Sequence, residues 1–258
     1  MRKHLYVDNT DLSTFGVYCS GQGTFGAPEK EITTYTVPGR DGLVLGVNER
    51  MENIRVVYPC FIYTNFAENM KNLRSFLLSR SGYVKINDDY DTTHFRMGFF
   101  EAGIDPDVTT KNDAGSFNLV FNCQPQRWLN SGETVIERLI TSTTTLPIVN
   151  ETQFVAKPFV RIYGYGNLTF YYEDGTRITI GIARNYNTDS GNEYIDIDCE
   201  TMDCFVGDAN YSNYVSFTAG ASQFGVDAPT LKPGTTTVRV LSGNHITRVQ
   251  ITPRWWEV

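Results

Sequence analysis

Short stretches with β-strand character recur along the whole chain, and turn-forming residues separate them. These stretches cover residues 15–20, 32–37, 43–47, 53–63, 83–86, 95–100, 116–123, 159–163, 168–172, 177–183, 193–200, 214–219, 236–241 and 246–251. A spacing of about 8–12 residues is typical of antiparallel strands joined by short connections. The chain also holds 29 Thr but only 10 Ala, and Thr favours strands where Ala favours helices. The sequence therefore predicts an all-β fold with one helix.

The one helix is predicted over Phe66–Ser79. Its apolar residues recur at helical intervals and form one face: Phe66, Met70, Leu73 and Leu77. Asn65 stands where a side chain caps the first free N–H groups, and Glu68 is in the capping-box position. Gly82 lies just beyond the predicted end. We expect this helix to pack on a sheet through its apolar face.

A tight hairpin is predicted over Thr33–Val47. Pro38 presets φ, and the pair Asp41–Gly42 is typical of turn positions with positive φ. In the C-terminal half, Glu173–Gly175 predicts a turn between strands 168–172 and 177–183. Residues 236–241 and 246–251 have the pattern of a further hairpin.

The strand pattern is interrupted near residue 130. Pro125 breaks it, and the Thr/Ser-rich stretch Thr141–Thr145 and Pro147 follow. We predict an N-terminal domain over residues 1–130, a connecting segment over 131–155 and a C-terminal domain over 156–258. Each domain is long enough to bury its own core. We expect a β-sandwich in each, with the helix and the extended hairpin in the first.

The chain is acidic, with a net charge of −7, and its Lys and Arg residues are scattered. Specific nucleic-acid binding needs clustered basic residues, so we expect none. The apolar stretch after the basic N-terminus ends at Asp8, too early for a signal peptide. No run reaches the ~20 apolar residues of a membrane span. We therefore expect a soluble chain made in the cytoplasm, without membrane contact.

Five cysteines are spread over the chain: Cys19, Cys60, Cys123, Cys199 and Cys204. Because their number is odd and no secretory signal accompanies them, we expect reduced thiols that fill gaps in the cores. Cys199 and Cys204 are the nearest pair in sequence, but no His or further Cys stands close by to complete a metal site.

Residues Gly21–Gly26 spell GxGxxG, the pattern of a dinucleotide-binding turn. In such a turn a helix follows the glycines and its N-terminus receives the pyrophosphate. The residues after Gly26 have β character without helical periodicity. We therefore predict a glycine-rich loop between strands.

Two acidic clusters have the composition of a cation or acid–base site. Asp89–Thr93 begins like an EF-hand loop, but His94 and Phe100 stand where that loop needs Gly and Glu. We predict a solvated acidic turn there. In residues 193–200 the acids alternate with apolar residues: Asp196, Asp198 and Glu200. This alternation favours the wet face of a half-buried strand over a metal site or a glycosidase-like carboxylate pair.

The three histidines are isolated in sequence: His4, His94 and His245. No GxSxG, HExxH or Cys-plus-His pattern accompanies them. The aromatic residues of the C-terminal half more often build cores and interfaces than sugar-stacking platforms. We predict no catalytic residue, no metal site, no cofactor and no enzymatic activity.

The order of features resembles one known family. In the first half the segments that carry the resemblance are Pro38–Gly42, Phe66–Ser79, Tyr83–Asp89 and Phe117–Pro125. In the second half they are Lys157–Gly164, Ile195–Met202, Leu231–Gly234 and Ile251–Trp255. Together they resemble, over essentially the whole chain, the distal tail protein of long-tailed, non-contractile bacteriophages with its galectin-like C-terminal domain. Two loops depart from the family: Asn150–Thr152 replaces an Asn-Pro-Gly lead, and Thr235–Thr236 stands where Asn often follows Pro-Gly.

The resemblance implies a structural protein of the virion tail tip, assembled in the host cytoplasm. Six copies would form a ring through their N-terminal domains and join the tail tube protein to the tail-tip or tail-associated lysin protein. The galectin-like domains would face outward, as a platform for receptor-binding proteins or as a bare rim, and DNA would pass through the ring. Because a hairpin can add to a neighbour's sheet, the predicted subunit-contact residues are Pro38, Gly39, Arg40, Asp41 and Gly42.

Three other functions stay open on the sequence. The galectin-like half would bind host cell-wall saccharide if exposed aromatic rings stood beside carboxylates. Two convergent carboxylates in a cleft would make the chain an enzyme acting on peptidoglycan or another glycan. Tail-tube proteins also have β-sandwich folds, although a tube subunit usually needs only one core domain.

Overall fold

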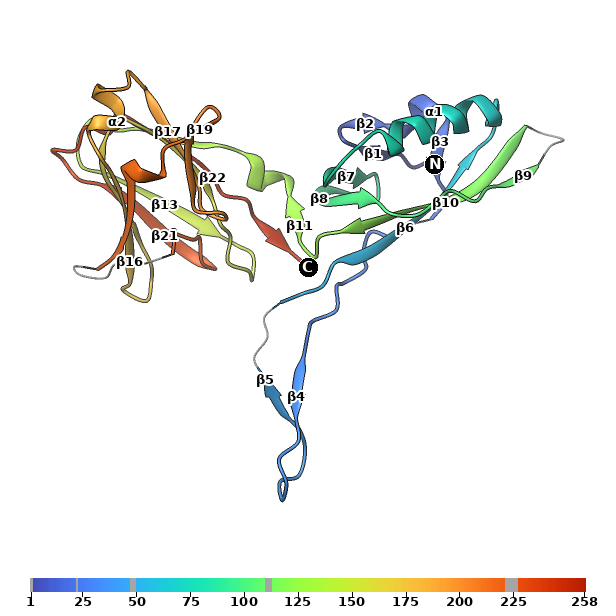
Figure 1. Ribbon diagram of the computed structural model, residues 1–258, viewed down its shortest axis with the longest axis horizontal. Coiled ribbons are helices and arrows are strands. Elements are labelled where there is room, and N and C mark those ends of the chain that lie inside the picture. The colour runs from blue at the N-terminus through green and yellow to red at the C-terminus, as the bar shows by residue number, and fades with distance from the viewer. Residues whose placement is uncertain (1, 22, 47–49, 110–112, 221–226) are drawn as a thin grey trace. The chain divides into compact units, whose positions relative to one another are not determined.

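The structure is a computed structural model that describes residues 2–21, 23–46, 50–109, 113–220 and 227–258 (Figure 1). It divides into two compact units, and the division falls between Arg127 and Trp128, with Val258 grouped with the first unit. Strands are the main regular structure of both units, which confirms the expected all-β fold with one helix of several turns. None of the helices in these ranges combines the length and the apolar character needed to span a bilayer.

The first unit is built on one antiparallel sheet with the strand order β2-β1-β7-β8-β10-β6-β3. Its strands are β1 (Leu5–Val7), β2 (Thr10–Asp11), β3 (Val17–Cys19), β6 (Ile54–Ile62), β7 (Val84–Asp88), β8 (Asp91–Phe100), β9 (Asp107–Thr109) and β10 (Ala114–Cys123). β9 pairs with β10 beside this path. A bridge between Lys3 and Cys19 joins the β1 region to β3, so the sheet curls back toward itself.

Helix α1 (Phe66–Leu78) packs on this sheet, as Figure 1 shows. Its buried residues are Phe66, Met70, Leu73 and Leu77, the face predicted from the sequence. The predicted cap is wrong in one respect. Asn65 has a left-handed conformation with φ of 51° and its side chain makes no capping bond. Instead the Asp113 carboxylate accepts the Phe66 N–H at 3.2 Å, so a distant residue caps the helix.

The second unit is a sandwich of two antiparallel sheets, as expected for the C-terminal half. One sheet has the order β12-β22-β14-β17-β18-β19 and the other β13-β21-β15-β16-β20. The first contains β12 (Ile136–Leu139), β14 (Phe159–Tyr163), β17 (Tyr194–Asp198), β18 (Asp203–Val206), β19 (Ala209–Asn210) and β22 (Arg248–Thr252). The second contains β13 (Thr144–Asn150), β15 (Gly166–Tyr171), β16 (Arg177–Ile182), β20 (Val215–Ala219) and β21 (Gly234–Val240).

Short elements complete both units. They are the 3-10 turns η1 (Leu12–Phe15), η3 (Asn130–Glu133) and η4 (Ser212–Tyr214), the one-turn helix α2 (Asn185–Thr188), and the paired strands β11 (Arg127–Leu129) and β23 (Trp256–Glu257). The predicted turn at Glu173–Gly175 is confirmed, since β15 pairs directly with β16 around it.

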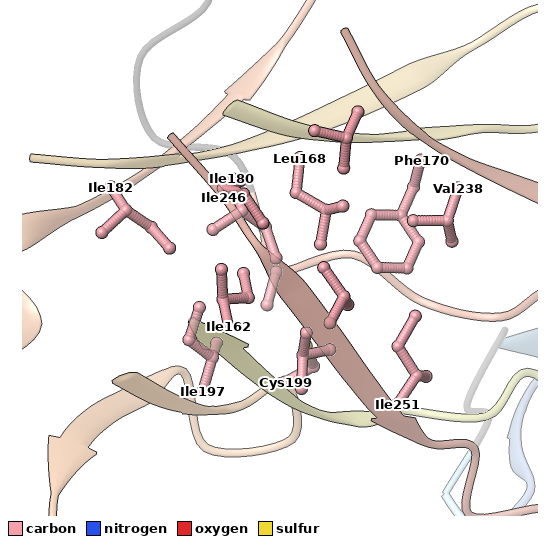
Figure 2. Packing of buried hydrophobic residues seen from close by; sticks show 14 of the residues in the cluster. Ile162, Leu168, Phe170, Ile180, Ile182, Ile197, Cys199, Val238, Ile246 and Ile251 are labelled. Carbon is pink, nitrogen blue, oxygen red and sulfur yellow. The ribbon is translucent and has the colours of Figure 1, made fainter. Parts of the chain in front are cut away.

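The core of the second unit lies between its two sheets (Figure 2). Ile162, Ile197 and Ile251 come from the six-stranded sheet and meet Leu168 and Phe170 of the five-stranded sheet. All five of these side chains are completely buried. This alternation of inward apolar residues is the periodicity that the sequence showed.

Two expectations about the second unit are wrong. Residues 131–155, expected to connect the domains, contain β12 and β13, which pair with β22 and β21. Thr suits a strand, and Pro147 is tolerated because β13 is an edge strand. Residues 236–241 and 246–251 do not form a hairpin, since β21 and β22 belong to opposite sheets.

All five cysteines are buried free thiols, as expected.

Candidate assembly surface

A two-stranded arm separates from the sheet of the first unit (Figure 1). β4 (Thr33–Tyr35) pairs with β5 (Val44–Gly46), and Thr34 stands opposite Leu45. The ribbon continues past the strands, where the Glu31 N–H donates to the Arg50 carbonyl at 3.1 Å. We call residues 30–46 together with 50 and 51 the arm. Val47 of the predicted hairpin lies outside the described residues.

The tip of the arm turns at Pro38 and Gly39. The Arg40 N–H donates to the Val37 carbonyl at 3.2 Å, and Gly39 has a φ of 79°. Pro followed by a residue of positive φ is a type II turn. Gly42 also has positive φ, but Asp41 does not. The prediction that Asp41–Gly42 supplies a pair of positive φ values is therefore wrong, because the Pro-Gly pair makes the turn.

The five predicted subunit-contact residues, Pro38 to Gly42, are all exposed at this tip. The arm also exposes large apolar side chains that the sequence analysis did not single out. Ile32 is 59% exposed, Tyr35 57%, Leu43 61% and Leu45 64%. No other strand in the described part of the chain pairs with β4 or β5.

Among the residues that the structure describes, an arm of this composition lacks a partner that would cover its apolar side chains. An isolated two-stranded hairpin is marginally stable, because it has no sheet or helix to cover its apolar side chains. Both edges of the ribbon also carry unpaired backbone groups, which form a template for another strand. Exposed apolar residues gathered on one segment are typical of a protein–protein contact. The arm therefore has the chemistry of a docking element.

Buried polar residues hold the root of the arm. The Thr24 hydroxyl donates to the Asp88 carboxylate at 2.7 Å, and the Tyr58 hydroxyl donates to the same oxygen at 2.9 Å. Arg96, only 5% exposed, donates to the Gly26 carbonyl at 2.8 Å. Burial lowers the pKa of Arg96 from its usual value, and burial beside Asp88 raises the pKa of Tyr58 well above its usual value. The chain that enters the arm is thus fixed to β6, β7 and β8.

The GxGxxG segment is part of this root, and the prediction of a loop between strands is confirmed. A Cβ on Gly23 would lie 2.6 Å from the Val57 carbonyl oxygen, so the glycine permits close packing on β6. Gln22 lies outside the described residues. β4 follows the loop, with no helix at which a phosphate would bind.

The acidic turn at Asp89–Thr93 is only partly solvated, which corrects the prediction: Thr92 and Thr93 are exposed, whereas the aspartates have partners. The Asp91 carboxylate is 13% exposed, pairs with His94 at 2.8 Å and contacts Arg127. Asp89 accepts the His4 N–H at 3.0 Å. Partners from distant segments close the turn, so the local sequence pattern did not reveal them.

The histidines have separate environments. His4 pairs with Asp11 at 2.8 Å, His94 with Asp91, and His245 stacks on Tyr165 with ring centres 4.4 Å apart. In the described ranges no three His, Cys, Asp or Glu side chains are grouped so that they could hold a metal ion.

The acidic residues Asp196, Asp198 and Glu200 also do not form a solvent-exposed strand face, which corrects the prediction. Asp196 is 3% exposed and accepts two bonds from Arg161, at 2.6 and 2.7 Å. Asp198 accepts two from Arg254, at 2.8 and 2.9 Å. Glu200 lies beyond the end of β17 and is exposed. Arg161 stands directly opposite Asp196 on β14, so a cross-strand ion pair covers the carboxylate.

Arginines also cover the nearby aromatic rings. The Arg161 guanidinium lies 4.2 Å from the centre of the Tyr194 ring, and Arg248 lies 3.7 Å from that of Tyr163. Cation–π contacts of this kind stabilise the outer face of the sheet. Because the two carboxylates and the two rings already have partners within the chain, this face lacks the open acid-and-ring pattern of a saccharide site.

Comparison with known proteins gives a match at the level of fold. No protein-family model matches the sequence, and no curated protein matches it. The crystal structure of SPP1 Dit is described as a paradigm of the hub adsorption apparatus in phages that infect Gram-positive bacteria. It superposes with a TM-score of 0.67 at 15% identity, over 99% of both chains.

A chain of the phage P2 baseplate in its activated conformation superposes with a TM-score of 0.51 at 11% identity, over 97% of both chains. The fold expected from the family resemblance is therefore confirmed: over nearly its whole length this chain has the fold of SPP1 Dit and of the phage P2 baseplate chain.

Proposed function

We propose that the chain is the distal tail protein of a long-tailed bacteriophage, a structural hub of the virion tail tip assembled in the host cytoplasm. Six copies form a ring through their first units, which joins the tail tube protein to the tail-tip or tail-associated lysin protein. The second units face outward, as a platform on which receptor-binding proteins dock or as a bare rim. The ring is the conduit through which DNA leaves.

The observation that carries the proposal is the exposed apolar arm on a chain with the hub fold. An arm that adds to the next subunit makes a heterologous contact, and such contacts close into a ring when the rotation between subunits allows it. Tyr35, Leu43 and Leu45 become buried in that contact. The arm then gains the covering layer that a single chain does not provide.

The acidic composition supports a conduit. Six chains together carry six times the net charge of −7. Negative charge that faces the lumen repels phosphates, which lets DNA slide without being held.

The arm is tested by replacing Leu43 and Leu45 with Ser. We expect the L43S/L45S protein to lose the hexamer and run as a monomer, because the apolar contact is removed. The matched control replaces two leucines of the second unit that are also at least half exposed, Leu139 and Leu241, with Ser and keeps the hexamer. Circular dichroism checks that both variants are folded. An L43S/L45S protein of unchanged hexameric mass would overturn the arm's role.

A further inference from the structure

Two of the five cysteines face each other across neighbouring strands. Cys19 on β3 stands directly opposite Cys60 on β6 in the antiparallel register. Their sulfur atoms lie 3.9 Å apart. Both side chains are almost fully buried, at 4% and 1% exposure.

The backbone around this pair has the geometry that a disulfide needs. The Cys19 N–H donates to the Lys3 carbonyl at 2.9 Å, away from β6, while the Ser20 N–H donates to the Pro59 carbonyl at 2.8 Å. Cys19 and Cys60 therefore occupy a non-hydrogen-bonded position of the ladder. Cα atoms at such positions are about 4.5 Å apart, within the range of disulfide-linked cysteines.

We propose that Cys19 and Cys60 are a modification site that closes to a cross-strand disulfide on exposure to an oxidised low-molecular-weight thiol such as glutathione disulfide. One protein thiolate attacks the glutathione disulfide and releases one glutathione. The second protein thiolate attacks the resulting mixed disulfide and releases the other glutathione. Two protein thiols are thus oxidised, and one glutathione disulfide is reduced to two glutathione molecules.

The bond would clamp the root of the arm. Cys19 and Cys60 are 41 positions apart, and the whole arm lies in the loop between them. β3 is the last strand on its side of the sheet, and the bond fastens it to β6, the strand that follows the arm (Figure 1). The segments that enter and leave the arm are then covalently joined beneath it.

The other cysteines lack this arrangement. Cys204 stands opposite Ile197 rather than Cys199, and Cys123 stands opposite Ile54 and Gly98. The thiol–thiol hydrogen bond with Cys19, together with burial, raises the pKa of Cys60 well above its usual value. Because the thiolate is the reacting form, the folded pair reacts slowly and stays reduced where glutathione is mostly reduced.

The test is oxidative refolding, which removes the barrier of burial. The full chain is unfolded in urea, refolded with a mixture of oxidised and reduced glutathione, and alkylated under denaturing conditions. We expect three of the five thiols to remain, and a peptide pair linked through Cys19 and Cys60. C60S should form no disulfide, and C199S, the matched control, should form the same one. Five remaining thiols in the folded protein, or a disulfide through any other cysteine, would overturn the proposal.

A second readout tests the clamp. We expect oxidation to raise the melting temperature of the first unit by roughly 5–15 °C and to leave that of C60S unchanged. If the bond forms and the melting temperature stays the same, the clamp is contradicted. Neither result depends on the hexamer, because the bond lies within one chain.

Discussion

The Thr24 hydroxyl donates a hydrogen bond to the Asp88 carboxylate, 64 positions further along the chain. This bond ties the loop that enters the arm to the last residue of β7. The same carboxylate accepts the Tyr58 hydroxyl and the N–H groups of Tyr90 and Asp91. One buried acid thus fixes the root of the arm to three strands.

Replacing Asp88 with Ala should destabilise the first unit by about 3 kcal/mol, because it leaves several buried donors unpaired. T24V removes one donor with a side chain of similar size and should lower the free energy of unfolding by about 1 kcal/mol. Far-UV circular dichroism during urea unfolding measures both variants. A change below about 0.5 kcal/mol for D88A would show that Asp88 does not hold the root.

Replacing Arg161 with Ala should lower the free energy of unfolding of the second unit more than replacing Asp196 with Ala. R161A leaves a buried carboxylate without a partner, which typically costs about 3–5 kcal/mol. In D196A the remaining Arg161 side chain, 34% exposed, can turn to water. Tryptophan fluorescence during urea unfolding measures both variants. Equal losses, or a larger loss in D196A, would contradict the account of a covered carboxylate.

Acid should destabilise the second unit partly through Asp198. Burial by itself would raise the pKa of Asp198, but the hydrogen bonds and the charge of Arg254, together with the backbone N–H groups of Glu200 and Thr201, outweigh burial and hold the pKa below its usual value. A carboxyl whose pKa is lower in the folded state contributes stability above its unfolded pKa of about 3.9. It loses that contribution as pH falls through the folded value.

Between pH 6 and pH 3 the urea midpoint of the unmodified protein should therefore fall further than that of R254M, in which Arg254 no longer contributes to lowering the pKa of Asp198. R239M, which changes an exposed arginine on the other sheet, is the control and should keep the full pH dependence. The account fails if R254M and R239M respond to acid in the same way.

Replacing Arg40 and Asp41 together with Ala should weaken the ring. Both residues are exposed at the tip of the arm, and we predict that they lie at a subunit contact. Light scattering should show a larger monomer fraction than for the unmodified protein at equal concentration. The alanines leave the Pro38–Gly39 turn in place, so the arm keeps its shape. Recovery of intact hexamers at all concentrations would count against a contact at these two residues.

Local patterns in the sequence predicted the elements well. The apolar face of α1 follows from its helical spacing, and β15 with β16 follows from alternation around Glu173–Gly175. Contacts between residues far apart in the sequence could not be predicted from these local patterns. Asp113 caps α1 from 47 positions away, and turn residues between two strands do not say whether both strands join one sheet.

The candidate surface was predicted in part. Its tip was found through Pro38–Gly42, because turn chemistry is local. The root of the arm was not predicted, because Thr24, Asp88 and Arg96 meet only in the folded chain. The prediction of a solvent-exposed face for Asp196, Asp198 and Glu200 was wrong for a related reason. Alternation shows which residues share a face of a strand, but it does not show whether that face is covered by water or by an arginine of the neighbouring strand. Arg161, which interrupts the apolar run Val160–Ile162, was a usable signal of such a cover.

The mass of the purified protein in solution tests the central claim most directly. Light scattering coupled to gel filtration, repeated over a wide range of concentrations, should give about six times the 29.1 kDa of one chain, and L43S/L45S should give the mass of one chain. An unmodified protein that stays monomeric at every concentration would contradict the ring.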